Sequence, residues 1–347
     1  MKFSKLITVG LALTAIFMTS CERHDPEDET PISGYENGIL ITNEGGFSTP
    51  TASVSFLSND FSVNESDIFA KNNNSEKLGN VLQSISFKGD LAYLVVNKPS
   101  KIEIVNRNNF QKTGTITTNL DQPRYIAFHG NHTYVTNNNF FDVKKVSVFD
   151  AGNQFVKDIH FPRYAEKITS SGGYIYVQTD GVDYTPNEVP TGHSISRINP
   201  ANNEVDKEII LTDNAPIRDM VSDQNFVYVL TSDDMNTYLY TITADSGIFN
   251  KTQFSGITQA RNLALDQGKI YFFTGDNTVH AVTGNSSAPL FHTNSSAYVY
   301  GFNVIGPHVF ISEPSFTSDS TVKIFNLSGA LVKTLSTGIG TNGFYKN

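Results

Sequence analysis

The sequence predicts an all-β protein, a seven-bladed β-propeller, from three observations. First, 15 tyrosines, 25 phenylalanines and 34 asparagines stand beside only 17% charged residues, a composition typical of strands and turns rather than amphipathic helices. Second, one pattern recurs along the chain from Gly38: an apolar strand, a turn of Gly, Asn or Asp, and a second strand that contains a tyrosine. Third, the last residues have the pattern of a first strand, which the first copy lacks.

Charge and cysteine content exclude several classes of protein. A net charge of −9 and a pI near 5.3 argue against nucleic-acid binding, which requires a basic face to neutralise phosphates. One cysteine cannot form an internal disulfide, and no Cys/His cluster has zinc spacing. His129 and His132 fall at a hairpin turn, where we expect solvent and not a metal. Asp180, Asp183 and the pair 233–234 offer carboxylates but not the ligand density of a calcium loop, so we predict no metal.

Residues 1–20 have the features of an export signal. Lys2 and Lys5 precede an apolar stretch, Leu6 to Met18, that is too short to span a membrane comfortably. Cys21, the only cysteine, follows the apolar stretch after Thr19 and Ser20. The whole segment resembles a bacterial lipoprotein signal in which that cysteine is lipidated. The alternative is an ordinary secretory peptide with a chance cysteine. Lipidation would hold the protein by acyl chains instead of a transmembrane helix.

Residues 21–37 form an acidic tether, and residues 38–347 form the predicted single propeller domain. The tether is rich in Asp and Glu and is interrupted by two prolines, so it cannot bury apolar area and should be disordered. Acidic residues just after the lipidated cysteine resemble the signal that sends Bacteroidetes lipoproteins to the outer face of the outer membrane. A plain solubilising linker is the alternative. We therefore expect a lipid-anchored protein of the outer membrane that faces the cell exterior.

The repeats have the period of propeller blades. Tyr125–Asn137 is the clearest copy of strand, turn and second strand. Second-strand anchors follow one another at spacings of 53, 41, 42, 52, 43 and 38 residues, and they are Leu40, Tyr93, Tyr134, Tyr176, Tyr228, Tyr271 and Val309. Seven anchors at this spacing match blades of four short strands. Alternating segments such as Lys101–Asn106 follow as third strands, with one face toward each neighbouring sheet.

The two ends of the repeat region predict how the ring closes. The chain starts on a second strand, Ile39–Asn43, and ends with Gly340–Tyr345, which has the pattern of a first strand. We expect the C-terminal strand to complete the first blade and hide the sheet edges. A pair of packed sandwiches, the rival fold, predicts neither seven copies nor such a terminal strand.

Several motifs also resemble a known family. Tyr134-Val-Thr-Asn137 matches the motif of the YVTN propeller repeats, and this resemblance covers residues 38–347. Asn43–Gly46, Leu78–Asn80, Pro123–Ile126 and the leader resemble the cobalamin-binding propeller lipoproteins of Bacteroidetes B12-uptake systems. That resemblance implies a surface protein that binds a corrinoid and passes it to a TonB-dependent outer-membrane transporter.

Aligning the first strands of the blades predicts a ring of side chains at one mouth of the central channel. The aligned residues are Gln83, Arg124, Glu166, Arg218, Arg261, Tyr300 and Phe344. Three of the seven arginines occupy this position. They would hold the phosphate and amide carbonyls of a corrinoid, because guanidinium groups present several donors at fixed geometry. Alternatively, they form a structural ladder that braces neighbouring blades.

Aromatic residues occur in the loops that follow second strands, on the same face, where no strand pattern requires them. They are Phe47, Phe140, Phe141, Tyr184 and Phe316. Amide-rich loops with aromatic residues suit a large, amide-decorated, partly apolar ligand. The alternative is that these rings fold back over the blade edges. We include these five residues in the predicted ligand site.

Two classes of function stay open. The first is a lipoprotein that captures a corrinoid for a transporter, and the second is a module that binds a protein or glycan through the same face. No G-x-S-x-G, H-E-x-x-H, P-loop or Rossmann motif occurs, so we do not expect an enzyme or a bound cofactor other than the corrinoid ligand.

Overall fold

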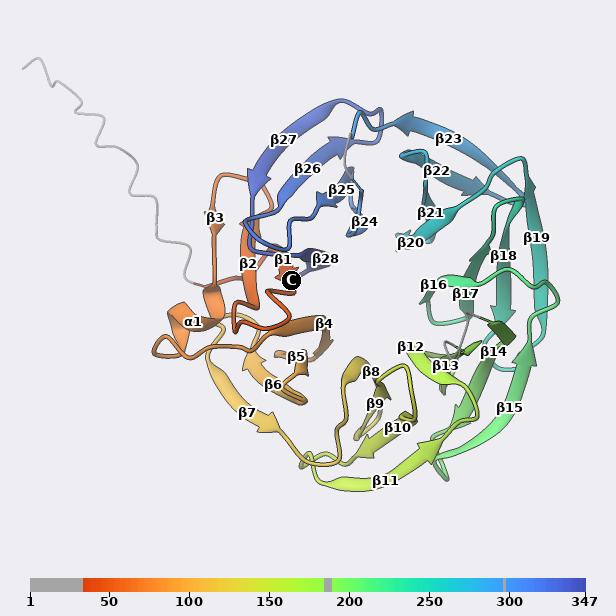
Figure 1. Ribbon diagram of the computed structural model, residues 1–347, viewed down its shortest axis with the longest axis horizontal. Coiled ribbons are helices and arrows are strands. Elements are labelled where there is room, and N and C mark those ends of the chain that lie inside the picture. The colour runs from red at the N-terminus through yellow and green to blue at the C-terminus, as the bar shows by residue number, and fades with distance from the viewer. Residues whose placement is uncertain (1–33, 184–188, 296–297) are drawn as a thin grey trace, which may run out of the picture. The chain divides into compact units, whose positions relative to one another are not determined.

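Seven four-stranded antiparallel sheets surround a central axis (Figure 1). The computed structural model describes residues 34–183, 189–295 and 298–347. Residues Gly34–Asn347 form one compact unit. The predicted all-β, seven-bladed fold is confirmed. The signal, Cys21 and most of the acidic tether lie outside the described residues.

Each blade consists of four strands that run outward from the central channel. From the inner strand outward, the blades are β28 (Thr341–Lys346), β1 (Gly38–Asn43), β2 (Ser53–Ser58), β3 (Asn64–Glu65); β4 (Val81–Lys88), β5 (Leu91–Lys98), β6 (Lys101–Asn106), β7 (Lys112–Ile116); β8 (Pro123–His129), β9 (His132–Asn138), β10 (Lys144–Phe149), β11 (Phe155–His160); β12 (Tyr164–Ser171), β13 (Tyr174–Asp183), β14 (Val189–Asn199), β15 (Glu204–Ile210); β16 (Ile217–Ser222), β17 (Phe226–Ser232), β18 (Asn236–Thr243), β19 (Phe249–Ser255); β20 (Ala260–Asp266), β21 (Lys269–Thr274), β22 (Thr278–Thr283), β23 (Ser286–His292); and β24 (Phe302–Ile305), β25 (His308–Glu313), β26 (Thr321–Asn326), β27 (Leu331–Ser336).

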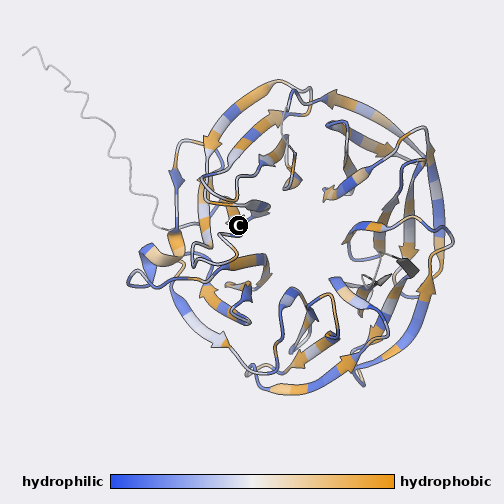
Figure 2. Cartoon of the chain, in the orientation of Figure 1, coloured by the Kyte–Doolittle hydropathy of each residue, from blue (hydrophilic) through white to orange (hydrophobic). Residues whose placement is uncertain are grey.

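The second strands are the most buried because sheets pack against both of their faces. In β9 and β17 every residue but the first is buried. In β5 every residue but the first and the last is buried. Outer strands such as β15 and β27 mix exposed polar and apolar residues (Figure 2). The predicted anchors Tyr93, Tyr134 and Tyr176 are all buried. Burial raises the pKa of Tyr134 to about 12, so its hydroxyl stays protonated.

The hydrophobic core is divided into seven clusters in the described part of the chain, and each cluster joins two neighbouring blades. Tyr93 of β5, for example, packs with Ile126 of β8 and Val135 of β9. Ile41 of β1 and Phe310 of β25 belong to the cluster between the last blade and the first. Because every cluster needs both of its blades, no blade buries its faces alone.

The C-terminal strand closes the ring as predicted. Ile41 of β1 pairs with Phe344 of β28, and Leu40 pairs with Tyr345. The Thr341 hydroxyl also donates to the Asn43 side-chain carbonyl at 2.6 Å. The first blade is therefore assembled from both ends of the described chain, and Figure 1 shows β28 beside β1 on the channel side.

The one helix of the described residues, α1 (Ile68–Asn72), lies on the outside of the first blade (Figure 1). It buries Ile68 and Phe69, and the Asp67 side chain caps it by accepting from the amide of Ala70 at 3.3 Å. Within the ranges that the structure describes, no helix has the length and apolar character needed to cross a membrane.

The closure predicts a severe effect of deleting residues 341–347. The deletion removes the burial of Phe344, about 1.5–3 kcal/mol of apolar stabilisation, and the partial burial of Tyr345, against a typical stability of about 5–15 kcal/mol. It also leaves β1 with an unpaired edge. We expect aggregation by size-exclusion chromatography or a large fall in melting temperature. Lys346→Ala, at an exposed position of the same strand, is the control, and an unchanged melt of the deletion would contradict the closure.

Candidate functional site

One face of the propeller collects the loops that were predicted to bind a ligand. Because neighbouring strands are antiparallel, the inner strands begin on the same face on which the second strands end. We call this the entry face; it includes the loops at residues 44–52, 139–143, 233–235 and 314–320. The opposite side, which carries the turns between first and second strands, is the exit face.

Large apolar side chains are exposed on the entry face. Phe47, Phe141 and Phe316 are 68%, 73% and 54% exposed, and Phe140 is 39% exposed. Phe47 and Phe141 are mostly open to solvent, whereas Phe140 packs against Tyr164, with ring centres 5.9 Å apart, in the way the alternative expects. Met235 and Tyr298, which the sequence analysis did not select, join them with 73% and 57% exposure. Tyr184 lies outside the described residues.

The exposed rings are held in place by their neighbours. The Lys98 ammonium lies 3.7 Å from the centre of the Phe47 ring. The Phe316 ring packs edge-on against Tyr300, with centres 5.8 Å apart. Gly340, at φ +65°, lies beneath it, and a Cβ at that position would come within 3.2 Å of the Phe316 ring. The absence of a side chain at position 340 therefore leaves room for this ring beside the start of β28.

Three of the predicted ring residues form a chain of hydrogen bonds across three blades. Arg124 of β8 donates from Nη1 to Gln83 Oε1 at 2.6 Å and from Nη2 to Glu166 Oε1 at 2.7 Å. Its Nε donates to the same carboxylate at 3.0 Å. Burial disfavours the charge of Arg124, but the Glu166 carboxylate outweighs this effect and raises the Arg124 pKa. This geometry supports the structural-ladder alternative for Arg124.

The other two arginines are less engaged. Arg218 donates from Nε to the Ser232 carbonyl at 2.8 Å, and its side chain borders the channel cavity. The Arg261 guanidinium lies over the Tyr298 ring, 5.1 Å from its centre. Among the described residues, the terminal guanidinium nitrogens of Arg218 have no hydrogen-bond partner within the chain. The ligand-binding role of these arginines stays a prediction.

The placement of Phe344 at the channel mouth is wrong. Phe344 is 2% exposed and packs against Phe310 at 5.5 Å between ring centres. The strand register gives the reason. Phe344 pairs with Ile41 in the first blade in the same way that Ile126 pairs with Val135 in the third blade. Ile126 lies two residues after Arg124, so Phe344 lies two residues after the equivalent position. Asn342 therefore occupies the position equivalent to Arg124.

Asn342 and Tyr300 meet at a partly buried carboxylate that the sequence analysis missed. Glu44, which directly follows β1, accepts from the Tyr300 hydroxyl at 2.7 Å and from Asn342 Nδ2 at 3.2 Å. Burial raises the pKa of Glu44, against the opposing effect of these two hydrogen bonds. Tyr300 thus lines the channel, as predicted, but it lies in the loop before β24 and not in a strand.

A small polar cavity of about 190 Å³ lies in the channel beneath these residues. It is lined by Glu44, Gln83, Tyr125, Lys167, Arg218, Asp219, Asn262, Tyr300, Asn342 and Tyr345. Lys167 Nζ lies 3.2 Å from Asp219 Oδ1 and 4.4 Å from the centre of the Tyr125 ring. Burial lowers the pKa of Lys167, but Asp219 outweighs this effect, so the net shift is upward.

Lys167, Asp219 and Tyr125 each stand one residue after a predicted ring position. For two of them the sequence signal is a pair of adjacent charged residues within a predicted inner strand, Glu166-Lys167 and Arg218-Asp219. Among residues whose side chains are described, no three histidine, cysteine, aspartate or glutamate side chains gather as a metal site would require.

Comparison with known proteins extends the fold assignment. A family model described as "Domain of unknown function (DUF5074)" matches residues 37–179. A search of curated proteins finds no match. Hydrazine synthase of Kuenenia stuttgartiensis is 18% identical, with a TM-score of 0.60 over 76% of this chain and 88% of that chain. BamB of Moraxella catarrhalis is 11% identical, with a TM-score of 0.55 over 88% and 85%.

A third similar structure is dihydro-heme d1 dehydrogenase NirN, 11% identical, with a TM-score of 0.55 over 89% of this chain and 75% of that chain. Two of these three relatives are named as enzymes. At such low identity the likeness shows the fold alone, so it carries no catalytic role to this chain. The comparisons therefore define a β-propeller whose first part matches a family of unknown function.

The bonding pattern predicts that Arg124 and Arg218 differ in their contribution to stability. Arg124→Gln leaves the Glu166 carboxylate without its guanidinium, and we expect a loss of about 1.5–3 kcal/mol in unfolding free energy. Arg218→Gln removes one hydrogen bond to a backbone carbonyl, and we expect a loss of about 1 kcal/mol or less. Urea denaturation of both variants provides the measurement. Equal losses would argue against the bracing role of Arg124.

Proposed function

We propose that this protein is a cell-surface lipoprotein that captures a corrinoid across its entry face and passes it to a TonB-dependent outer-membrane transporter. The observation that carries the proposal is the set of exposed rings on the entry face. Phe141 and Phe47 are more than two-thirds exposed, and exposed apolar side chains that share one face favour a binding role when a ligand can bring them together.

The chemistry of the entry face suits a large amphipathic ring. Phe47, Phe141, Phe316 and Tyr298 offer flat apolar contact. The channel cavity adds hydrogen-bonding groups, among them the Arg218 guanidinium, whose Nε alone is bonded within the described chain. A corrinoid presents an apolar macrocycle edged with amides and a phosphate, and both kinds of contact are therefore available to it.

The size of the cavity determines how such a ligand would bind. A volume of about 190 Å³ is smaller than the roughly 300–1,000 Å³ of pockets that enclose drug-sized ligands. The macrocycle would lie across the mouth, over the rings, and only a projecting side group would enter the channel. An open arrangement of this kind leaves one side of the ligand free for a receiving transporter.

The path of the chain is compatible with display from a lipid anchor. Tyr35, near the start of the described chain, is held at the exit face, where Asn347 Nδ2 donates to its carbonyl at 2.5 Å. The backbone N–H of Asn347 also donates to the Gly38 carbonyl at 2.8 Å. Tyr35, like Asn347, therefore lies on the face opposite to the exposed rings.

A protein- or glycan-binding module is the second candidate. Its support is the distribution of the exposed rings: Phe47, Phe141 and Phe316 follow β1, β9 and β25, so they belong to separate blades. Rings spread in this way also suit a broad macromolecular surface. The binding experiment below distinguishes the two functions.

We expect cyanocobalamin to bind in isothermal titration calorimetry. Phe141→Ala and Phe316→Ala should each weaken binding by about 1 kcal/mol, which is roughly fivefold, because each removes one aromatic contact. Ile248→Ala is the matched control, since Ile248 is 68% exposed but lies in the turn before β19, on the exit face. Absence of heat with the wild-type protein, while a protein or glycan partner binds in a Phe141-dependent manner, would replace corrinoid capture by the module.

The lipid anchor has a separate test. Cys21→Ala should release the protein from the membrane fraction, because the lipid is the proposed anchor. Replacing Asp25, Glu27, Asp28 and Glu29 by their amides should keep the protein membrane-bound but protect it from protease added to intact cells. Undiminished cleavage of this variant would contradict the export role of the acidic residues.

A further inference from the structure

The channel cavity contains hydrogen-bond acceptors that the protein itself does not use. Glu44 accepts from Tyr300 and Asn342 through Oε1 alone, at 2.7 and 3.2 Å, so its Oε2 has no donor within the described chain. The side-chain nitrogen of Asn262 donates to the Tyr300 carbonyl at 3.5 Å, which leaves Asn262 Oδ1 as a second acceptor. Glu44 and Asn262 both line the cavity. A ligand that enters the channel therefore meets acceptors that require a donor.

The same cavity also contains donors with hydrogens to spare. Lys167 Nζ lies 3.2 Å from Asp219 Oδ1, and this single contact leaves two of its three ammonium hydrogens available. The Tyr125 hydroxyl accepts from Gln83 Nε2 at 3.2 Å, and its own hydrogen has no acceptor in the part of the chain that the structure describes. Lys167 Nζ lies 4.4 Å from the centre of the Tyr125 ring, so the two donors are neighbours.

The formal charges of the cavity lining cancel. Lys167 and Arg218 are cationic, and two carboxylates, Glu44 and Asp219, oppose them. A phosphate or carboxylate would therefore gain no net attraction, and it would leave Glu44 Oε2 and Asn262 Oδ1 without donors. An ammonium group would leave the Lys167 and Tyr125 hydrogens without acceptors. The lining favours a neutral group that both donates and accepts hydrogen bonds.

The volume of the cavity limits which neutral group can enter. A primary carboxamide bridges an acceptor and a donor about 8 Å apart, from two hydrogen bonds of about 2.9 Å and roughly 2.3 Å between its oxygen and nitrogen. That span suits a cavity of about 190 Å³. The nucleotide of a corrinoid, with its base, ribose and phosphate, requires the roughly 300 Å³ or more of a drug-sized ligand. An amide arm fits in the channel, and the nucleotide does not.

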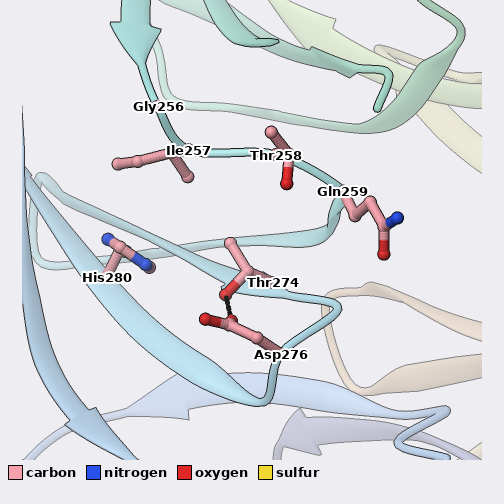
Figure 3. A pocket seen from close by; sticks show the side chains of 7 residues that line it. All are labelled: Gly256, Ile257, Thr258, Gln259, Thr274, Asp276 and His280. Atoms are coloured by element: carbon pink, nitrogen blue, oxygen red, sulfur yellow. Dashed lines mark hydrogen bonds between the residues drawn. The ribbon is translucent and has the colours of Figure 1, made fainter. Parts of the chain in front are cut away.

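A second cavity on the entry face is larger but lacks this arrangement. It has a volume of about 250 Å³ between the β19–β20 loop and the β21–β22 hairpin, and Gln259, Asp276 and His280 are among the residues that line it. Figure 3 shows the Gln259 carboxamide turned away from His280. Asp276 already accepts from the Thr274 hydroxyl at 2.5 Å. The polar groups of this second cavity therefore do not converge on one small group.

We propose that a primary carboxamide arm of the bound corrinoid, and not its phosphate-bearing nucleotide, enters the channel, where Glu44 accepts from the amide nitrogen and Lys167 and Tyr125 donate to the amide oxygen. This inference rests on the proposed capture of a corrinoid. It makes Glu44 the residue that distinguishes an amide arm from a carboxylate arm. A carboxylate has no hydrogen to donate to Oε2, and its charge is repelled by that of Glu44.

The test is isothermal titration of the full chain with three corrinoids: cyanocobalamin, cobinamide, which lacks the nucleotide, and cobyrinic acid, whose arms are all carboxylates. We expect cobinamide to bind within about threefold of cyanocobalamin, and cobyrinic acid to bind at least about tenfold more weakly than cobinamide. Glu44→Gln replaces the free acceptor by a donor. It should weaken the binding of cobinamide about tenfold and reduce the discrimination against cobyrinic acid by a similar factor.

Two further variants accompany Glu44→Gln. Asp276→Asn removes a carboxylate from the second cavity and should leave the affinity for cobinamide unchanged. Tyr125→Phe keeps the ring beside Lys167 but removes the hydroxyl donor, so it should weaken the binding of cobinamide about fivefold. If Glu44→Gln does not fold, unchanged affinity in Tyr125→Phe is sufficient to overturn the inference.

The outcomes separate this inference from the function on which it rests. If the wild-type protein binds no corrinoid, corrinoid capture is wrong, and the assignment of the channel is wrong with it. If cyanocobalamin binds but cobinamide binds more than about tenfold more weakly, the nucleotide is the group that is recognised, and only the assignment of the channel is wrong. An equal effect of Glu44→Gln on cobinamide and cobyrinic acid would also overturn that assignment alone.

Discussion

The pairing of β28 with β1 is the constraint on which the rest of the structure depends. A propeller blade buries its faces only against its two neighbours, so an incomplete first blade would expose the clusters on both sides of it. The same pairing also constructs the candidate site. Asn342 comes from the closing strand, Glu44 from the strand it closes on, and Tyr300 from the last blade, and they meet only in the closed ring.

The hydrogen-bond chain through Arg124 gives the entry face a rigid base. Its partners Gln83 and Glu166 belong to the blades on either side, and Asn138 adds a further bond to Glu166 at 3.1 Å. These groups satisfy one another and set the positions of the strand entries. The exposed side chains of the neighbouring loops, such as Phe140 and Phe141, are then supported by a framework that need not rearrange.

The sequence predicted the fold to the level of single strands because each blade repeats the same local pattern. The buried tyrosines of the second strands and the missing first strand were both readable from period alone. Phe344 was placed wrongly because the repeat pattern aligned it with Arg124, whereas the strand pairing aligns Asn342, two residues earlier, with Arg124. Lys167 and Asp219 were missed for another reason. The repeat period predicts which strand lines the channel, but the bulges within β12 and β16 determine which residues of those strands face the channel. The cavity at His280 depends on packing between a loop and a hairpin, which no repeat encodes.

The junction of Tyr35, Arg107 and Asn347 ties both ends of the described chain to one side of the propeller. Arg107 Nε donates to Asn347 Oδ1 at 2.9 Å, and Asn347 Nδ2 donates to the Arg107 carbonyl at 3.0 Å. A fluorophore or affinity tag added after Asn347 would therefore emerge far from the exposed rings. Sensor chips that capture the protein through such a tag would present every molecule with its ring-bearing side toward the solution, so that surface-based screening samples that side without chemical modification of it.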